Sequence, residues 1–523
     1  MKNFFNVHGK LVLTLLSFLA ISLYYAIGNG VFPSIDGPSH WNNANLLKQY
    51  FLGNEVVKQN FELNTFYIPN IFSQYLLMFL MFFFKSTGAM IVFQIIHYMS
   101  FFMGFLYFLK AYQVKYAFFM SLIAVLFFNA FLLNIGFYNF SFSVIFLIIA
   151  IGYYQKHFSS NNSLHSSNYL ILFVLLALLF YSNALTLLVF FLFVAFKELV
   201  KLYHHIKIKK ASVKEFVLNE IKIVITFVPF LIMISLFRLN FPFQNPPMFS
   251  NDIGRYFSEL ISLSSFIVYH VSNEFEFVQW IEYSLLALFV WTLFWRIKKR
   301  KDGFNQSDVI FMLLLSVLAL YLIIPDMYSV GMMSSRFLYF FFLFLILWLL
   351  LQNTKVIKLL MVLCIIVTVF FERDRRHIQI LNQMNSKLKL VEQASLLIVP
   401  NSIVLPLDFS GNWLERHFAH YIGADKSLII LDNYEATVGW FPLKWRASTI
   451  PKYLLGESET VDGIYDCINK QGISKPIDYI FMYGDRRRIS DNPQFVNILS
   501  KHYKKMITAE NGMCSVYKLK ASD

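Results

Sequence analysis

The sequence is dominated by apolar runs that are close to the length needed to cross a lipid bilayer. A transmembrane helix needs about 20 apolar residues, because each residue adds about 1.5 Å and the hydrocarbon layer is about 30 Å thick. These runs predict a polytopic α-helical membrane protein with about eleven spans. The runs lie at 10–29, 67–84, 88–109, 116–133, 140–155, 168–196, 221–240, 276–296, 308–324, 337–351 and 356–371.

The charge pattern supports this class and argues against nucleic-acid binding. Of 523 residues, 57% are hydrophobic and 15% are charged, whereas soluble domains have about 25% charged residues. The net charge of +14 comes from short basic clusters between apolar runs, such as 201–210 and 296–301. Basic loops mark the cytoplasmic side of a membrane. The N-terminus is therefore predicted inside and the chain after the last run outside.

The first half of the chain leaves two topologies open. In the first, 67–84 crosses the membrane and 168–196 is one span. In the second, 67–84 is a re-entrant or juxtamembrane helix, and 168–196 is a hairpin of two short spans. The second topology places three more lysines inside, so the charge rule favours it. These lysines are Lys110, Lys115 and Lys156.

The sequence divides into two predicted domains: residues 1–377, a transmembrane domain with a first outer loop at 30–87, and residues 378–523, an extracytoplasmic α/β domain. Short runs of β-branched and aromatic residues alternate with helical stretches in the second domain, which is typical of a layered α/β fold. The predicted strands are 403–408, 427–432, 478–483 and 514–519, and the predicted helices are 411–422, 459–471 and 493–505.

The first outer loop contains the sequence D-G-P-S-H, in which Asp36 and His40 flank Gly37 and Pro38. One interpretation is structural: Asp36 accepts backbone hydrogen bonds in a turn, and Pro38 opens a helix. The other is functional: Asp36 is a general base or metal ligand just above the membrane, with His40 beside it. The sequence leaves both interpretations open.

Polar residues also interrupt the apolar runs elsewhere. Tyr138 and Asn139 lie between two runs, and Asn183 lies inside a third. Amides at membrane depth are costly unless they face protein or a water-filled cavity, so these residues either cap helices and bond between them or line a site. Arg336 opens a late run. It either snorkels to the interface or binds a phosphate.

Several familiar catalytic signatures are missing from the sequence. There is no Walker A loop, no H-E-x-x-H, no G-x-S-x-G and no G-x-G-x-x-G. The pattern therefore argues against an ATP-driven pump, a zinc metalloprotease, an α/β-hydrolase and a dinucleotide-binding enzyme.

Taken together, these motifs resemble those of the GT-C superfamily of integral-membrane glycosyltransferases. The segment D-G-P-S-H-W-N-N-A at 36–44 is similar to the acidic first-loop motif of that superfamily. The segment N-I-G-F-Y-N-F at 134–140 matches its second outer loop, the polar break at 181–183 matches the following hairpin, and Arg336 matches a basic residue that opens a late span. The second topology is also the layout of the superfamily.

The resemblance implies a transferase that moves a sugar from a polyprenyl-phosphate donor to a glycan, lipid or protein acceptor in the cell envelope. Asp36 and His40 would be catalytic, and Tyr138, Asn139, Asn183 and Arg336 would bind substrate. The implied location is the bacterial cytoplasmic membrane, with the lipid bilayer as partner and no nucleic acid.

The sequence leaves the metal dependence of such an enzyme open. Asn139 stands where relatives often have a carboxylate, so no metal ligand is assigned, no cofactor is certain, and a divalent metal is one option. The rival hypothesis is a non-catalytic component of a surface-polysaccharide pathway, either a scaffold or a translocator of lipid-linked sugar.

Overall fold

The computed structural model describes residues 34–128, 130–159, 165–209, 213–241, 247–248, 253–261, 272–298, 306–324, 326–327, 331–352, 355–368, 374–449, 477–484, 493–508 and 513–520. The chain forms two compact units, which are described separately. The helical unit comprises Met1–Leu16, Ile96–Asn134 and Tyr138–His377. The loop-and-sheet unit comprises Ser17–Ile95, Ile135–Phe137 and Ile378–Asp523. The predicted first span at 10–29 and the predicted helix at 459–471 lie outside the described residues.

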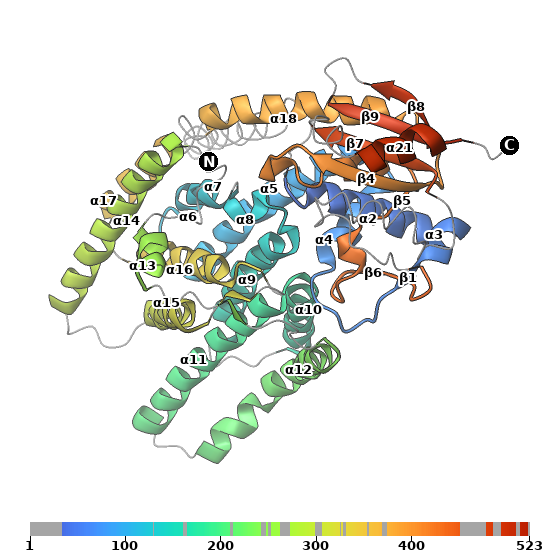
Figure 1. The fold of residues 1–523 in the computed structure, drawn as a ribbon. Coiled ribbons are helices and arrows are strands. Elements are labelled where there is room, and N and C mark those ends of the chain that lie inside the picture. The colour runs from blue at the N-terminus through green and yellow to red at the C-terminus, as the bar shows by residue number, and fades with distance from the viewer. Residues whose placement is uncertain are drawn as a thin grey trace, which may run out of the picture. The chain divides into compact units, whose positions relative to one another are not determined.

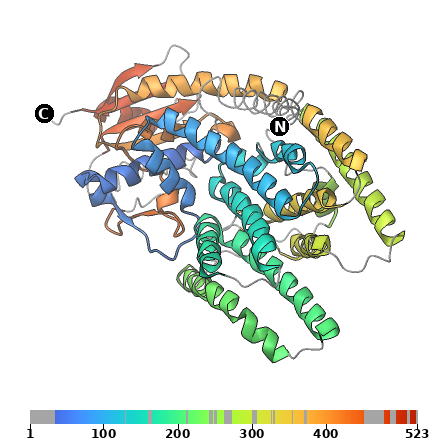
Figure 2. The same ribbon diagram turned by 180° about the vertical axis from the view of Figure 1, so that it is seen from behind.

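Long apolar helices make up the helical unit (Figure 1 and, from behind, Figure 2). Five described helices are long and apolar enough to cross a membrane: Ser86–Ala111, Tyr138–Phe158, Glu220–Asn240, Val278–Lys298 and Met333–Leu350. The prediction of a helical membrane protein is thereby confirmed, while the number eleven stays a prediction. The helices are α5 (Ser86–Ala111), α9 (Tyr138–Phe158), α10 (Ser166–Ser182), α11 (Ala184–Lys209), α12 (Val213–Asn240), α13 (Ile253–Ile261), α14 (Ser272–Lys298), α15 (Gln306–Ile323), α16 (Met333–Leu350) and α17 (Lys355–Thr368).

Helix α16 forms much of the core of this unit, because almost every residue from Phe337 to Leu350 is buried. Its Phe340 ring packs on Phe140 of α9, with ring centroids 5.3 Å apart. The predicted run at 116–133 is not one helix. It forms four short pieces, α6 (Ala117–Met120), η1 (Ser121–Ala124), α7 (Val125–Phe128) and α8 (Phe131–Asn134), and the 3₁₀ turn η1 breaks the α-helical hydrogen-bond pattern.

Two features of the helices fit the second predicted topology. Helix α4 (Phe72–Met81) has 10 residues and is therefore about 15 Å long, about half the thickness of the hydrocarbon layer. The run at 168–196 breaks at Asn183, whose backbone is extended (φ −164°, ψ 119°). The Asn183 side chain then accepts a hydrogen bond from the backbone N–H of Thr186, which caps the start of α11.

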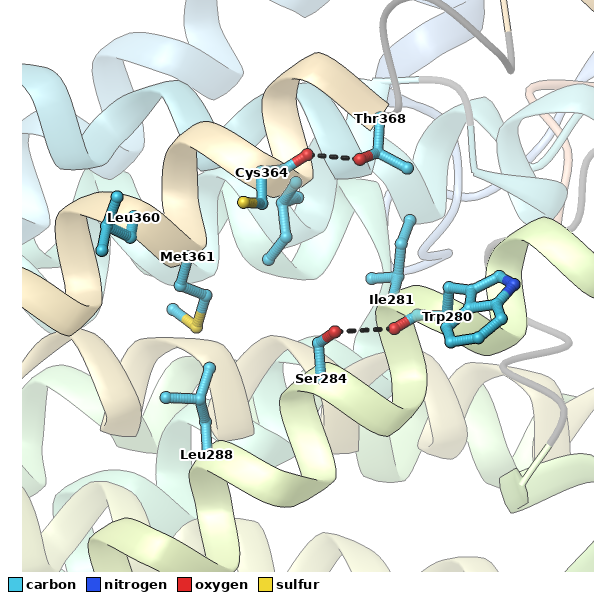
Figure 3. A pocket seen from close by; sticks show the side chains of 9 residues that line it. Trp280, Ile281, Ser284, Leu288, Leu360, Met361, Cys364 and Thr368 are labelled. Carbon is cyan, nitrogen blue, oxygen red and sulfur yellow. Dashed lines mark hydrogen bonds between the residues drawn. The ribbon is translucent and has the colours of Figure 1, made fainter.

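An apolar groove lies between α14 and α17 in the helical unit (Figure 3). Its volume is about 380 Å³, and it is lined by Trp280, Ile281, Ser284, Leu288, Leu360, Met361, Cys364, Ile365 and Thr368. The hydroxyls of Ser284 and Thr368 donate to backbone carbonyls of their own helices, at 2.8 and 2.5 Å. The groove therefore offers apolar surface rather than groups for chemistry.

A five-stranded mixed sheet is the centre of the loop-and-sheet unit, in the order β5-β4-β7-β9-β8. Strands β5, β4 and β7 run parallel, and β9 and β8 continue antiparallel. The strands are β4 (Ile403–Phe409), β5 (Ile429–Ile430), β7 (Tyr479–Gly484), β8 (Tyr503–Thr508) and β9 (Cys514–Leu519). Four of them overlap the segments in which the sequence predicts strands.

One predicted helix in this unit is confirmed and another is wrong. The predicted helix at 493–505 is α21 (Pro493–His502), which leads directly into β8, whereas the segment 411–422 forms the 3₁₀ turns η4 (Trp413–Glu415) and η5 (Phe418–Gly423). Long-range contacts account for this difference. The buried Glu415 accepts from Tyr483 and from Lys387, both at 2.5 Å, which fixes this segment against the sheet and the helix α18 (Asp374–Ser395).

The first loop packs into the core of the sheet. It forms α2 (Gly37–Phe51), α3 (Glu55–Asn60) and β1 (Phe61–Leu63), and β1 pairs antiparallel with β6 (Leu443–Trp445). The Phe61 and Trp445 rings lie 4.3 Å apart. Leu46, Leu47 and Val57 are buried in one cluster with Leu405 and Ile480 of the sheet. This burial of apolar side chains holds α2, and therefore Asp36, in a fixed position against the sheet.

Candidate active site

Asp36 is the residue that immediately precedes α2, and its side chain is 22% exposed. Pro38 sits in the first turn of α2, where a missing N–H costs nothing. The Asp36 carboxylate makes no capping hydrogen bond to the described backbone of α2. The structural interpretation of Asp36 as a helix cap is therefore not supported, and the carboxylate is directed elsewhere.

The second-loop motif meets Asp36 at Gly136. The backbone N–H of Asp36 donates to the carbonyl of Ile135 at 3.0 Å. Gly136 has φ +106°, and a Cβ at this position would lie 2.6 Å from the Cβ of Asp36. Only glycine has both the backbone freedom and the small size for this position. The motif at 36–44 is thus in direct contact with the motif at 134–140 through Gly136.

Replacing Gly136 by alanine is expected to destabilise the fold and displace Asp36. The positive φ would cost about 1–3 kcal/mol, and the close contact would cost about 1–3 kcal/mol more. Gly53→Ala is the matched control, since Gly53 has φ +87° but its Cβ would meet only the Lys58 ammonium at 3.9 Å. Thermal unfolding in detergent should show the larger loss for Gly136→Ala. Equal losses for the two variants would mean that Asp36 is not held by this contact.

His40 is held by an ion pair and a hydrogen bond. Its Nδ1 lies 2.7 Å from Oε1 of Glu435, and its Nε2 lies 2.8 Å from the carbonyl oxygen of Gly136. A backbone carbonyl and a carboxylate are both acceptors, so these contacts favour the imidazolium form, in which both ring nitrogens carry a proton. Burial lowers the pKa of His40, but the Glu435 carboxylate, followed by Asp36, outweighs that effect and raises it above its ordinary value.

The Glu435 carboxylate is completely buried, and several donors surround it. Its Oε2 accepts from Asn43 Nδ2 at 2.9 Å and from Gln74 Nε2 at 2.5 Å. A buried charge is tolerated when it is paired and hydrogen-bonded in this way. The Glu435–His40 pair therefore places a fixed positive charge one helical turn after Asp36.

The surroundings of Asp36 raise the pKa of its carboxyl group towards neutral pH. Burial raises the pKa of Asp36 from 3.8 to about 6, opposed by the charge of His40 and by a hydrogen bond from Tyr434, and assisted by Glu435. A carboxylate whose pKa lies near the working pH is suited to act as a general base. Its partial exposure leaves it reachable by a hydroxyl group from outside.

Two histidines of the segment 411–422 complete the surroundings of Asp36. His417 Nε2 lies 3.7 Å from Asp36 Oδ1, and the His417 ring stacks on Tyr434 with centroids 4.9 Å apart. Burial, followed by the charge of His420, holds the pKa of His417 well below its ordinary value, so the ring is neutral. His420 bonds Ser39 Oγ through Nδ1 at 2.9 Å and faces Asp432 Oδ2 through Nε2 at 3.4 Å.

Four residues of this site are not among those that the sequence predicts: Glu435, His417, His420 and Asp432. The spacing H-x-x-H at 417–420 was the one local signal that could have drawn attention to this segment. Glu435 had no such signal, because only the folded chain brings it to His40.

The other predicted site residues lie in the helical unit. Tyr138 and Asn139 are buried at the start of α9. Asn183 caps α11, and Thr186 beside it bonds Ser143 of α9 through the two hydroxyls, 2.7 Å apart. The Arg336 guanidinium lies 5.7 Å from the centre of the Phe140 ring. A part for these four residues in substrate binding stays a prediction.

Comparisons with known proteins bear on the fold. No protein-family model and no curated protein matches the sequence. Among solved structures, the chain is similar to the crystal structure of ArnT from Cupriavidus metallidurans in the apo state, with a TM-score of 0.53, 11% sequence identity and 98% of each chain covered. At this identity the match shows the fold. The chain therefore shares its overall fold with that structure over nearly its whole length.

Proposed function

We propose that this protein is a membrane glycosyltransferase that moves a sugar from a polyprenyl-phosphate donor to an acceptor of the cell envelope, on the extracytoplasmic side. The single observation that carries the proposal is the placement of Asp36. This carboxylate is partly exposed, does not cap its helix, and lies beside the His40–Glu435 ion pair. The GT-C fold supports a lipid-linked sugar as the donor.

The proposed reaction is a single displacement at the anomeric carbon. An acceptor hydroxyl attacks that carbon while Asp36 takes its proton as general base. The bond between the anomeric carbon and the phosphate oxygen breaks, and polyprenyl phosphate leaves with the electron pair. Attack from the side opposite the leaving group inverts the anomeric centre.

We assign His40 a positioning part in this reaction. Because its ring nitrogens are bonded to Glu435 and Gly136, its orientation is fixed before substrate arrives. Its positive charge favours the ionised form of Asp36, which is the form that can accept a proton. Arg336 is proposed to bind the phosphate of the donor, since a guanidinium makes bidentate bonds to phosphate.

The proposal is tested by supplying substrates to the purified full-length protein in lipid nanodiscs. Radiolabelled polyprenyl-phosphate sugars, each with a different sugar, are incubated with envelope extract as the source of acceptor. The expected result is transfer of label from one of these donors to the extract, together with release of polyprenyl phosphate. If the chain is instead a scaffold, no donor is consumed, while deletion of its gene still alters the envelope glycans.

A further inference from the structure

We propose that His417, His420 and Asp432 bind one zinc ion in the loop-and-sheet unit. The two histidines belong to the turn η5, for which His417 is the N-terminal cap residue. A 3₁₀ helix has three residues per turn, so side chains at i and i+3 lie on the same face. Asp432 follows the short strand β5, and its carboxylate faces that pair.

The distances among the three side chains suit a metal ion. One ligand atom from each residue lies within 4.8 Å of the others. His420 Nε2 and Asp432 Oδ2 are 3.4 Å apart, which is longer than a normal hydrogen bond. Zinc binds nitrogen and oxygen at about 2.0–2.1 Å, and two ligands of a tetrahedron with such bonds lie about 3.4 Å apart.

A second observation comes from the other histidine nitrogen. His417 is 8% exposed, and its Nδ1 is buried without a hydrogen-bond partner among the described residues. Leaving a buried polar atom without a partner is costly. Donation of the Nδ1 lone pair to a metal removes this cost, so we assign Nδ1 of His417 as the ligand atom.

The second nitrogen of each histidine faces an oxygen atom of a polar side chain. A ligating imidazole commonly bonds a carboxylate or another polar group through its second nitrogen, which fixes the ring. His420 Nδ1 lies 2.9 Å from Ser39 Oγ, and His417 Nε2 lies 3.7 Å from Asp36 Oδ1. The zinc site would therefore hold His417 in place against Asp36.

The ligand set indicates which ion is bound. Two imidazole nitrogens and one carboxylate favour zinc or another late transition metal, whereas magnesium and calcium prefer oxygen ligands alone. Three protein ligands leave one tetrahedral position for water. The inference does not depend on glycosyl transfer, because zinc binding is measured without any substrate.

The test is the zinc content and zinc affinity of the full-length protein, purified without a polyhistidine tag. The protein is stripped with a chelator, loaded with zinc, freed of excess zinc and examined by mass spectrometry of the metal. We expect one zinc per chain, and cobalt in its place should give the visible absorption bands of a tetrahedral site. Wild-type protein that retains no zinc after this treatment would overturn the proposal.

Variants locate the site and separate it from surface binding. His420→Ala and Asp432→Asn should each lose zinc, whereas His502→Ala, which changes an exposed histidine of the same unit, should retain it. Ser39→Ala removes only the hydrogen bond to His420 and is expected to weaken zinc binding about 10- to 100-fold. Because Ser39→Ala removes no ligand, it tests the site even if the ligand variants do not fold. Unchanged affinity in Ser39→Ala, or equal zinc loss in His502→Ala, would contradict the assignment.

Discussion

Replacement of Asp36 by asparagine is expected to lower the rate of sugar transfer by about 100- to 10,000-fold, the usual contribution of a general base. An amide has the shape of the carboxylate but cannot take the acceptor proton. The loss should appear in kcat, since the chemical step is affected. The measurement is the transfer of label from a polyprenyl-phosphate sugar by protein in nanodiscs.

The matched control is Glu62→Gln, which makes the same change from carboxylate to amide in the same loop. Glu62 is partly exposed on β1, with 38% of its side chain accessible, and pairs with Lys444 and Arg446. Pairs of this kind near the surface contribute little to stability. We expect near-normal transfer from this control. If Asp36→Asn transfers sugar at the wild-type rate, Asp36 is not the base. If Asp36→Asn transfers no sugar but still restores a normal envelope in cells that lack the gene, the scaffold hypothesis becomes the better one.

Replacement of Glu435 by glutamine is expected to destabilise the protein by about 3–5 kcal/mol, because it leaves the buried His40 charge without its partner. The glutamine side chain also cannot accept from Asn43 and Gln74 as a charged group does. Sugar transfer should fall as well, since His40 loses the partner that fixes its ring beside Asp36. Chemical unfolding in detergent measures the first effect, and the nanodisc assay measures the second.

A double variant separates the ion pair from general damage. His40→Asn combined with Glu435→Gln removes both charges, and the two changes should be strongly non-additive because the residues are in direct contact. We therefore expect the double variant to regain part of the stability but not the activity. Additive losses would show that His40 and Glu435 do not act as a pair.

The pH dependence of the Glu435→Gln effect provides a further check on the same pair. The folded-state pKa of His40 is raised above 6.5. The contribution of the pair to stability is therefore complete below pH 6.5 and declines as the pH rises through that raised value. The difference in stability between wild type and Glu435→Gln should narrow in the same direction. A difference that widens with rising pH would mean that His40 is neutral in the folded protein.

The prediction of helices succeeded where the pattern was long and local. Helices α9 and α14 lie close to the predicted runs at 140–155 and 276–296. The break at Asn183 also followed from the sequence, because a short polar side chain inside an apolar run interrupts it and caps the next helix. The segment 116–133 was predicted less well, since apolar composition alone does not distinguish one helix from several short turns.

In the loop-and-sheet unit, local sequence pattern predicts the strands but not every helix. Strands β4 and β7 lie at predicted positions because β-branched and aromatic residues are concentrated there. The segment 411–422 has helical composition but forms 3₁₀ turns, because Glu415 accepts a hydrogen bond from Tyr483 of β7. A contact between residues so distant in the chain overrides a weak local preference.

The sequence by itself determined the membrane class, the positions of most long helices, and the candidacy of Asp36 and His40. These features depend on apolar length, charge placement and short motifs, which are properties of neighbouring residues. Only the tertiary structure decided that Glu435 holds His40, that Gly136 lies against Asp36, and that His417, His420 and Asp432 converge. Each of these contacts joins segments that are far apart in the chain. They form because burial of the apolar face of α2 and β1 against the sheet brings the polar side chains together.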